Sequence, residues 1–378
     1  MKKKIAVIGS GIAGLTAANL FKTNSDFEVM VYEREKTLSL EEGYGIQLAP
    51  NSVSILNKIG FSNISNNNFF NPSKLNFYSI DNNKICDLNL TRFNRDTVKY
   101  TTLKRSILVE FLKNNLFANN IKFGKEVKKV SKIKEKLLIN FADNTNDLVD
   151  FIIISDGVFS KTKLIIENKN IKPRYNGSIA IRKIIKSSEE FSYENENISL
   201  IMFPNAHIVI YPVNKNNELN LVCIVRQKSF LNKDLHLIIK KEILSQNKNL
   251  ENLFKGHLES WPIYLTKKPT KSIYENLFYL GDAFYTFPPT MAQGAGQSIE
   301  GAKELFDLLS QDSKEIQNLY FKKRLERTKL IDNRSRLNYF SFHLSNPLMV
   351  KIRNVMLKKI TKNEKLLDRY LGNIYQTV

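Results

Sequence analysis

A glycine-rich turn between two short apolar runs constrains this chain more than any other feature. Residues 5–8 (IAVI) form the first run, GSGIAG follows at residues 9–14, and a helical pattern continues to Lys22. The second run, Phe27–Tyr32, ends at Glu33, about 20 residues beyond the last glycine, as in a βαβ unit that binds a dinucleotide. A secretory signal peptide also begins with basic and apolar residues, but that alternative does not explain the second run or its acid.

The residue types in this turn suit a diphosphate. Gly9 allows the tight turn, Gly11 lets the diphosphate approach the backbone, and Gly14 lets the helix pack closely on the strand. Ala13 lies at the helix N-terminus, whose free N–H groups face the phosphates. Glu33 can accept hydrogen bonds from ribose hydroxyls. The sequence therefore predicts a dinucleotide site at this turn.

The remaining pattern predicts a discontinuous α/β domain with a β-rich insertion. A hairpin is expected at residues 75–90, several β segments between 176 and 226, and a strand at Asn276–Leu280 that returns to the first domain. From Ser298 the pattern is helical, with a break near Asn346-Pro347. The expected parts are a nucleotide-binding domain (1–72, 100–172 and 272–330), a β-rich substrate domain (73–99 and 173–271) and a C-terminal helical segment (331–378).

Four further elements follow from local periodicity. Helices are expected near Asn51–Lys58, with Asn51 as the N-cap, and at Leu103–Phe117. Strands are expected at Leu137–Phe141 and Leu148–Ile154, the second of which ends at Asp156-Gly157.

Composition narrows the class of protein. The 378 residues are 42% hydrophobic and 25% charged, which is globular, and 57 Lys and Arg against 37 Asp and Glu give a net charge of +20. Cys86 and Cys223 lie far apart, so a redox pair is not expected, and a disulfide reductase with two dinucleotide units is disfavoured. No two of the four histidines have metal-ligand spacing, so we expect no metal site. No apolar run is long enough to span a bilayer.

The loop after Leu280 is the second informative stretch. Gly281-Asp282 places an acid at a strand end, where it can bond sugar-like hydroxyls, and Pro288-Pro289 makes a rigid apolar wall. Residues 294–296 then open a helix whose free N–H groups can stabilise negative charge on a reduced flavin ring.

Together these motifs resemble the single-component FAD-dependent aromatic hydroxylases, the class of para-hydroxybenzoate hydroxylase and salicylate hydroxylase. The resemblance covers nearly the whole chain, and its specificity lies in the order and spacing of the pieces. They are residues 9–14 with Glu33-Arg34, residues 43–51 (GYGIQLAPN), Lys104-Arg105, Asp156-Gly157 with Ser160, Ile181-Arg182, residues 211–213, Gly281-Asp282 with Pro288-Pro289, and residues 335–338 (SRLN). Lys163 departs from the arginine that ends the family's DGxxSxxR pattern, and Phe284-Tyr285 departs from its Ala-His.

The resemblance implies a Rossmann-type FAD-binding domain, discontinuous, with an inserted β-rich substrate domain and a helical C-terminus. It also implies a monooxygenase that uses NAD(P)H and O2 and hydroxylates a small phenol- or benzoate-like aromatic by way of a peroxyflavin. The residues implied to bind FAD are Gly9, Gly11, Ala13, Gly14, Glu33, Arg34, Arg105, Val127, Asp156, Asp282, Gly294 and Ala295.

The substrate and catalytic candidates are less sharply defined. Pro288 and Pro289 are expected to wall the site, and Arg182 can pair with a substrate carboxylate in a bidentate fork. His207 and Tyr211 are four residues apart, so they share one face of a regular strand. Ordinary sheet packing also explains His207 and Tyr211, and a structural ion pair also explains Arg182. The sequence identifies no catalytic base.

The C-terminal segment is basic and amphipathic. An apolar stripe that includes Leu348, Ile352 and Met356 lies among lysines and arginines, which suits either packing on the protein or weak association with an anionic membrane surface. We expect no nucleic-acid partner, because aromatic residues are not interleaved with the charges. The expected location is cytoplasmic, with peripheral membrane contact as the alternative. A ubiquinone-pathway hydroxylase at the membrane and a non-hydroxylating FAD oxidoreductase stay open, as does the oligomeric state.

Overall fold

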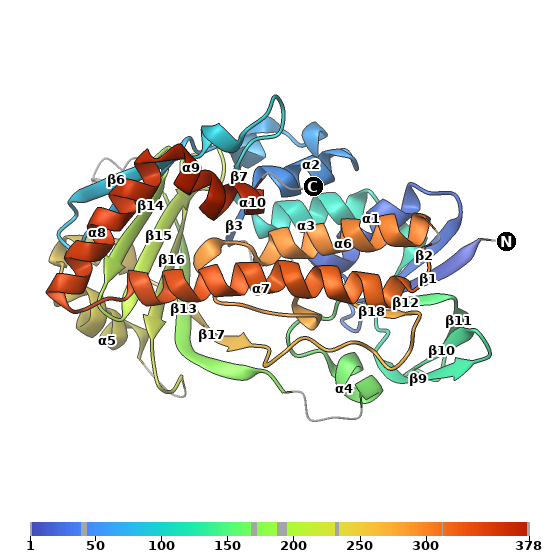
Figure 1. Ribbon diagram of the computed structural model, residues 1–378. Helices are drawn as coiled ribbons and strands as arrows, with labels where there is room; N and C mark the ends of the chain where they lie inside the picture. Colours follow the sequence, from blue (N-terminus) through green and yellow to red (C-terminus); the bar gives the residue numbers. More distant parts are fainter. Residues whose placement is uncertain are drawn as a thin grey trace.

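The computed structural model describes residues 2–38, 44–167, 172–186, 195–230, 234–311 and 313–375. Within these residues a five-stranded and a seven-stranded sheet lie at opposite ends of the molecule, and the long helix α7 (Ile316–Phe342) runs between them (Figure 1). Two smaller sheets of three strands complete the β structure of these residues.

The five-stranded sheet contains the predicted βαβ unit. Its order is β18 (Leu277–Tyr279), β12 (Phe151–Ile154), β1 (Lys3–Ile8), β2 (Phe27–Tyr32) and β8 (Ile121–Lys122), and every pair is parallel. Parallel strands are apolar on both faces because both faces are covered. The return of β18 to this sheet confirms that the α/β domain is discontinuous; the domain boundaries given above stay a prediction.

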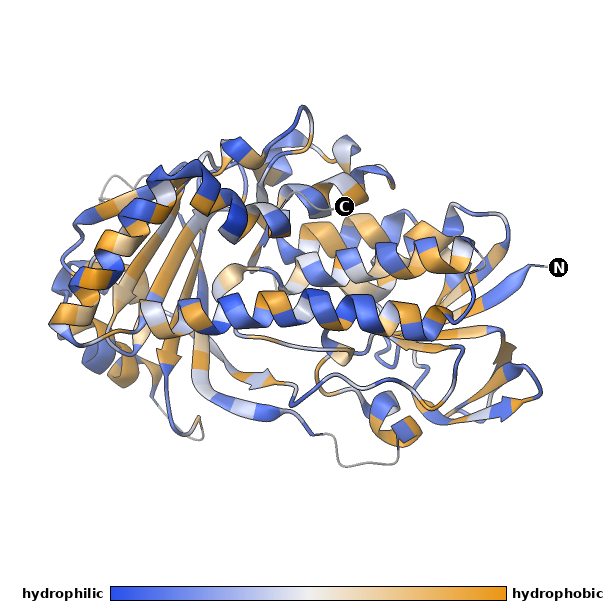
Figure 2. Ribbon diagram, viewed as in Figure 1, coloured by the Kyte–Doolittle hydropathy of each residue, from blue (hydrophilic) through white to orange (hydrophobic). Residues whose placement is uncertain are grey.

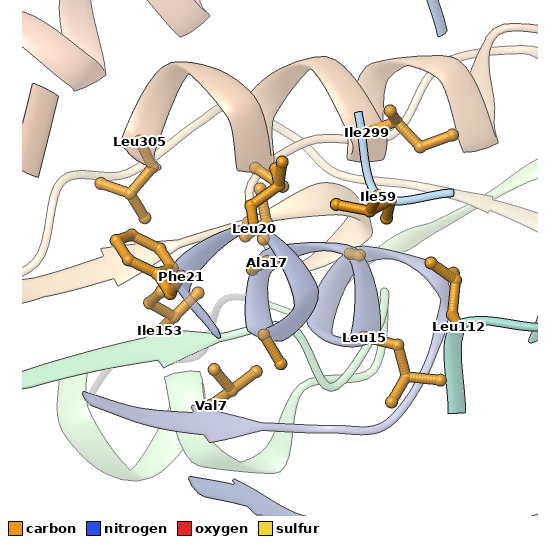
Figure 3. Close-up of a cluster of buried hydrophobic side chains, with 14 of the residues drawn as sticks. Val7, Leu15, Ala17, Leu20, Phe21, Ile59, Leu112, Ile153, Ile299 and Leu305 are labelled. Atoms are coloured by element: carbon orange, nitrogen blue, oxygen red, sulfur yellow. The ribbon is translucent and has the colours of Figure 1, made fainter. Parts of the chain in front are cut away.

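Helices cover one face of this sheet and a small sheet covers the other. On the first face α1 (Ile12–Lys22) packs with α3 (Arg105–Asn114) and α6 (Gly294–Ser310). Figure 3 shows side chains from these helices and from β1 and β12 meeting in one apolar cluster, among them Phe21, Leu112, Ile153 and Leu305. The other face packs on the antiparallel strands β9 (Val127–Ile133), β10 (Lys136–Phe141) and β11 (Asn146–Val149).

The seven-stranded sheet gathers strands from distant parts of the chain. Its order is β17 (Glu259–Leu265), β13 (Arg174–Lys186), β16 (Glu218–Arg226), β15 (Ala206–Pro212), β14 (Ile198–Phe203), β5 (Lys74–Tyr78) and β6 (Lys84–Asn89). The predicted hairpin at 75–90 therefore lies in the same sheet as the later β segments. One face packs on α5 (Leu235–Ile239), which continues through a π-helical turn, Lys240–Leu244, to a 3-10 segment, Lys248–Phe254. The opposite face is turned toward the C-terminal helices.

The remaining elements connect these layers. A small sheet of β3 (Gly45–Leu48), β7 (Thr101–Lys104) and β4 (Phe69–Phe70) joins the two ends, and α4 spans Lys161–Glu167. After α7 come α8 (Pro347–Lys362), α9 (Glu364–Leu367), a π-helical turn, Asp368–Gly372, and α10 (Asn373–Tyr375). The predicted break at Asn346-Pro347 is confirmed, because the Asn346 side chain caps α8.

Long-range pairing overturns two predicted elements. The expected helix from Leu103 begins only at Arg105, because residues 101–104 pair with both β3 and β4. The expected strand at 148–154 is two strands in different sheets, β11 and β12, separated at Asp150, whose carboxylate accepts from the Lys4 N–H. Local periodicity could not reveal either partner.

The predicted cap of the helix near residue 51 is also wrong. The helix, α2, spans Pro50–Asn57, with Ala49 at the N-cap and proline in the first turn. Asn51 is instead a buried link, because its amide donates to a Glu300 carboxylate oxygen at 2.6 Å and to the Ile374 carbonyl at 2.8 Å. Gly43, in the loop 43–51, lies outside the described residues.

Candidate active site

A cavity of about 240 Å³ lies at the carboxyl ends of β1, β2 and β12. Ligands of open parallel sheets bind at this edge. The cavity brings together six of the residues expected to bind the cofactor: Gly9, Gly11, Glu33, Arg34, Val127 and Asp156. Its other lining residues, which were not among the residues expected to bind FAD, are Ser10, Glu126, Ser155, Gly157, Lys161 and Thr162.

The three glycines of the first turn differ in what surrounds them. Gly9 has a φ of +100°, and a Cβ there would lie 2.9 Å from the Asp156 nitrogen. A Cβ on Gly14 would lie 2.0 Å from the Gly9 carbonyl oxygen. A Cβ on Gly11, by contrast, would have no atom of the described residues within 4 Å and would face the cavity. Gly9 and Gly14 are therefore required for packing, and Gly11 leaves space for a ligand.

Glu33 is fixed beside this turn. Its Oε2 accepts from the Ser10 N–H at 2.8 Å and from the Ser10 hydroxyl at 2.7 Å, and its Oε1 accepts from the Glu35 N–H at 3.0 Å. The acid at the end of β2 is thereby held in the wall of the cavity.

Asp156 and Lys163 connect the cavity to the second predicted loop. Burial raises the pKa of Asp156, whose Oδ1 is buried with no partner among the described residues. Lys163 donates to the Ala283 carbonyl at 2.8 Å, and burial lowers its pKa to about 8. The lysine that departs from the family pattern thus ties α4 to the turn after β18.

The Gly281–Asp282 turn packs directly against the first glycine turn. Gly281 has a φ of +61°, and a Cβ there would lie 2.9 Å from the Cβ of Ala13. Although Asp282 keeps solvent-exposed surface, the protein around its carboxylate desolvates it and raises its pKa to about 6, and the charge of Arg105 opposes that rise. Two more cofactor candidates, Arg105 and Asp282, therefore lie near each other, and Gly281, next to Asp282, packs on Ala13 of α1.

A second, larger cavity of about 480 Å³ lies between the seven-stranded sheet, β3, the loop at 289–295 and the helices α7 and α8. Its wall contains the remaining site candidates except Pro288, which is buried next to it: Arg182, His207, Tyr211, Pro289, Gly294 and Ala295. A Cβ on Gly294 would have no atom of the described residues within 4 Å, so the N-terminus of α6 has open space in front of it.

Polar groups gather at one part of this wall. Burial raises the pKa of Tyr211, and the nearby Arg182 charge and Gln47 side chain act in the opposite direction. The Arg182 guanidinium lies 5.6 Å from the ring centre of Trp261. Gln47 also accepts from the Tyr100 hydroxyl at 2.8 Å. Tyr211 therefore stays protonated at neutral pH and can donate to a ligand oxygen.

Two histidines far apart in the sequence meet in the same wall. His207 Nδ1 lies 2.7 Å from His343 Nε2, and both residues are buried. Burial lowers the pKa of each imidazole, so both are neutral near pH 7. Spacing along the chain could not reveal this pair, because 136 positions separate the two residues.

The pair is expected to make the fold sensitive to acid. Folding lowers the pKa of each imidazole. The folded state is therefore fully stable above the pKa of an unfolded histidine, about 6.5, and loses stability as the pH falls below that value. Each buried histidine is expected to lower the free energy of unfolding by up to about 1.4 kcal/mol per pH unit there. Between pH 7 and 5, denaturant unfolding of the His343→Gln variant should show a smaller loss of unfolding free energy than the parent protein shows. His257→Gln, whose side chain is 84% exposed, is the control and should match the parent protein.

The predicted SRLN segment of α7 holds the proline loop. The Thr290 hydroxyl donates to the Ser335 carbonyl at 2.7 Å, and the Asn338 amide lies 2.9 Å from the Met291 sulfur. Ser335 and Asn338 of this segment therefore hold the loop at 288–292, which forms part of the cavity wall. Among the described residues, no group of three His, Cys, Asp or Glu could hold a metal ion.

Known proteins resemble the chain in both sequence and fold. A model of an NAD(P)-binding Rossmann-like domain matches residues 7–41. The 3-amino-4-hydroxybenzoate 2-monooxygenase of Streptomyces platensis is 24% identical over 93% of this chain and 92% of its own length. The 6-hydroxynicotinate 3-monooxygenase of Bordetella bronchiseptica is 26% identical over 92% of this chain and 94% of its own.

Among solved structures, HpxO of Klebsiella pneumoniae, complexed with FAD and uric acid, has a TM-score of 0.84. It is 18% identical, over 97% of this chain and 95% of that one. The fold is that of the FAD-dependent aromatic hydroxylases. A salicylate hydroxylase substrate complex agrees, with a TM-score of 0.79 and 17% identity over 96% of this chain and 95% of that one. These structures confirm the predicted fold class, and the relatives, which are monooxygenases of aromatic compounds, confirm the predicted resemblance.

Proposed function

We propose that the protein is an FAD-dependent monooxygenase that consumes NAD(P)H and hydroxylates a small phenol- or benzoate-like aromatic. The observation that carries the proposal is the position of the two cavities. The turn that follows β18 packs on Ala13, two residues after Gly11 of the nucleotide cavity, and its continuation at Gly294 lines the apolar cavity. A molecule with a diphosphate at one end and a flat ring at the other suits this arrangement.

The residues present fit FAD. Gly11 and Gly294 each leave open space, one beside the first turn and one at the N-terminus of α6. The buried Asp156 Oδ1 has no hydrogen-bond donor among the described residues. Because buried acceptors are normally hydrogen-bonded, we expect a hydroxyl of a bound nucleotide, or a water next to it, to donate to this oxygen. Neither feature is needed by the fold itself.

In this proposal each group has one task. Gly11 and the N-terminus of α1 bind the diphosphate, Glu33 binds the adenosine ribose with Arg34 beside it, and Asp282 and Arg105 bind the ribityl region. Val127, which lines the nucleotide cavity, offers its backbone groups to adenine. Gly294 and Ala295 direct amides at the ring. When bound, the flavin supplies the chemistry by which NAD(P)H and O2 hydroxylate the substrate.

The polar part of the apolar cavity would orient the substrate. Arg182 binds a carboxylate or phenolate oxygen, and Tyr211 donates a hydrogen bond to an oxygen on the ring. His207 is neutral and lines the cavity, so it can accept a hydrogen bond from a phenolic hydroxyl, but burial lowers its pKa and makes it a weak base, so it is not assigned the phenolic proton. Pro289, with Pro288 behind it, and the apolar wall exclude water from the reacting atoms.

The proposal is tested by ligand-dependent flavin reduction. The purified protein is expected to be yellow, to release FAD on denaturation, and to be bleached faster by NADH or NADPH under anaerobic conditions when a hydroxylated aromatic is added. Oxygen-18 from O2 should then appear in the product. Flavin reduction without incorporation of oxygen, or a protein that holds no flavin, would contradict it.

The relatives do not favour the alternatives of a ubiquinone-pathway or non-hydroxylating enzyme, because those described above are hydroxylases of aromatic compounds. No helix of the described residues is long and apolar enough to cross a membrane. A cytoplasmic location, weak membrane association of α8 and the absence of a nucleic-acid partner stay predictions.

A further inference from the structure

The apolar cavity extends well beyond its polar groups. Cavities of a few hundred cubic ångströms suit ligands of drug size, and a wall made mostly of hydrophobic side chains gains its affinity from apolar area. Part of the 480 Å³ next to Gly45, Gly294 and Ala295 would be taken by the flavin ring in the proposed function. The composition of the rest of the wall shows what the ligand itself must offer.

The side chains that line the cavity change from partly polar to apolar from one strand of the seven-stranded sheet to the next. On β13 and β15 the lining side chains include Arg182, His207 and Tyr211. In the described part of the chain, the next three strands, β14, β5 and β6, contribute only apolar side chains to the wall: Ile198, Leu200, Leu75, Phe77 and Leu88. Neighbouring strands lie about 4.8 Å apart, so the span from β15 to β6 is about 14 Å. This length exceeds what a single substituted ring covers.

Helix α8 closes the same apolar part from outside. Met349, Ile352, Met356 and Ile360 recur at helical spacing and line the cavity. Ile352 and Met356 are still 45% and 56% exposed, so the cavity opens to the surface along this helix. Figure 2 shows apolar residues both along the strands of the sheet and on α8. Arg353 also lines the cavity, and its guanidinium donates hydrogen bonds to the Asn354 side chain and the Ser341 carbonyl.

We infer that the substrate is an aromatic ring with an apolar substituent, such as an alkyl or prenyl chain, lying between α8 and strands β14, β5 and β6. The inference rests on the proposed function, because it places the hydroxylated ring beside Arg182 and Tyr211 and the chain at the far end of the same cavity. A ring alone would leave the apolar part of the wall against water. Burial of the chain removes that exposed area, and the open edge along α8 gives a long substituent a way in.

The test is a series of 4-alkylphenols from methyl to octyl, bound to the purified FAD-containing protein. Dissociation constants come from the fluorescence of Trp261, the only tryptophan in the chain, which lies beside Arg182. Each added methylene is expected to raise the affinity about fourfold until the chain fills the space. Affinity that stays constant or falls with chain length would overturn the inference.

Two variants on α8 test where the apolar substituent of the ligand lies. Ile352→Trp narrows the cavity, and we expect it to lower the ratio of octylphenol to methylphenol affinity at least tenfold. Val355→Trp is the matched control, since Val355 is 57% exposed on α8 and is not among the described side chains of the cavity wall. Its ratio should stay within twofold of the parent. Equal effects of both variants would place the apolar substituent on the outer surface of α8 and overturn the inference.

The two proposals fail in different ways. If methylphenol binds and accelerates flavin reduction but longer chains bring no gain, the inference fails and the proposed function stands. If the protein holds no flavin and no phenol of any length accelerates reduction, the proposed function itself fails. Tryptophan fluorescence still reports binding in that case, because Trp261 does not depend on the flavin.

Discussion

Gly11→Val is expected to give a folded protein that has lost most of its flavin. The backbone of Gly11 has a φ of −77°, which any residue adopts, and no atom of the described residues lies within 4 Å of its Cβ position. The valine side chain therefore costs the fold little. Its methyl groups instead enter the cavity where the proposed diphosphate would lie, so FAD content should fall at least about tenfold, the effect of losing roughly 1.4 kcal/mol of binding free energy.

A neighbouring glycine provides the contrast. Gly14→Ala would place a Cβ 2.0 Å from the Gly9 carbonyl oxygen, and we expect a loss of about 3 kcal/mol or more of folding stability. The measurements are FAD released per mole of protein and the denaturant midpoint of the flavin-free forms. A Gly11→Val protein with full flavin would refute the diphosphate site, and one with a lowered midpoint would show that Gly11 is needed for packing.

The sequence could reveal this turn because all its determinants are local. The strand at Phe27–Tyr32 and the acid that follows it lie within one βαβ unit, and the structure places them as expected. The loop after β18 was also recognisable, since a strand, an acid, two prolines and a helix start follow one another directly. Such a segment needs no distant partner to fix its conformation.

Features that depend on distant partners were not predicted. Residues 101–104 are β rather than helical because they pair with β3 and β4. Gln47 and Tyr100 meet through a hydrogen bond between side chains 53 positions apart, and the His207–His343 contact joins a strand to the end of α7. The first two features involve the small sheet of β3, β7 and β4, and the third depends on where the end of α7 meets the seven-stranded sheet, so no local pattern contains them.

Arg182→Leu is expected to weaken binding of 4-hydroxybenzoate by roughly 10- to 100-fold, the loss typical of a hydrogen bond to a charged group. Arg182 lines the apolar cavity, and its guanidinium lies near the rings of Trp261 and Tyr44 at 5.6 and 5.9 Å. A planar guanidinium held in this way can meet a carboxylate with two parallel hydrogen bonds. Arg182→Lys keeps the charge and loses the fork, so we expect an intermediate affinity.

The neighbouring residue on the same strand is the matched control. Lys183 points to the opposite face of β13, where its ammonium group donates to the Lys255 carbonyl, so Lys183→Leu should bind within twofold of the parent. The flavin spectrum reports binding, and FAD content should be equal in all three variants because Arg182 lines the apolar cavity, away from the glycine turn. Repeating the titration with 4-methylphenol separates charge from shape. A loss confined to 4-hydroxybenzoate assigns Arg182 to the carboxylate, equal losses assign it to the ring or its phenolic oxygen, and no loss for either ligand leaves Arg182 a structural role alone.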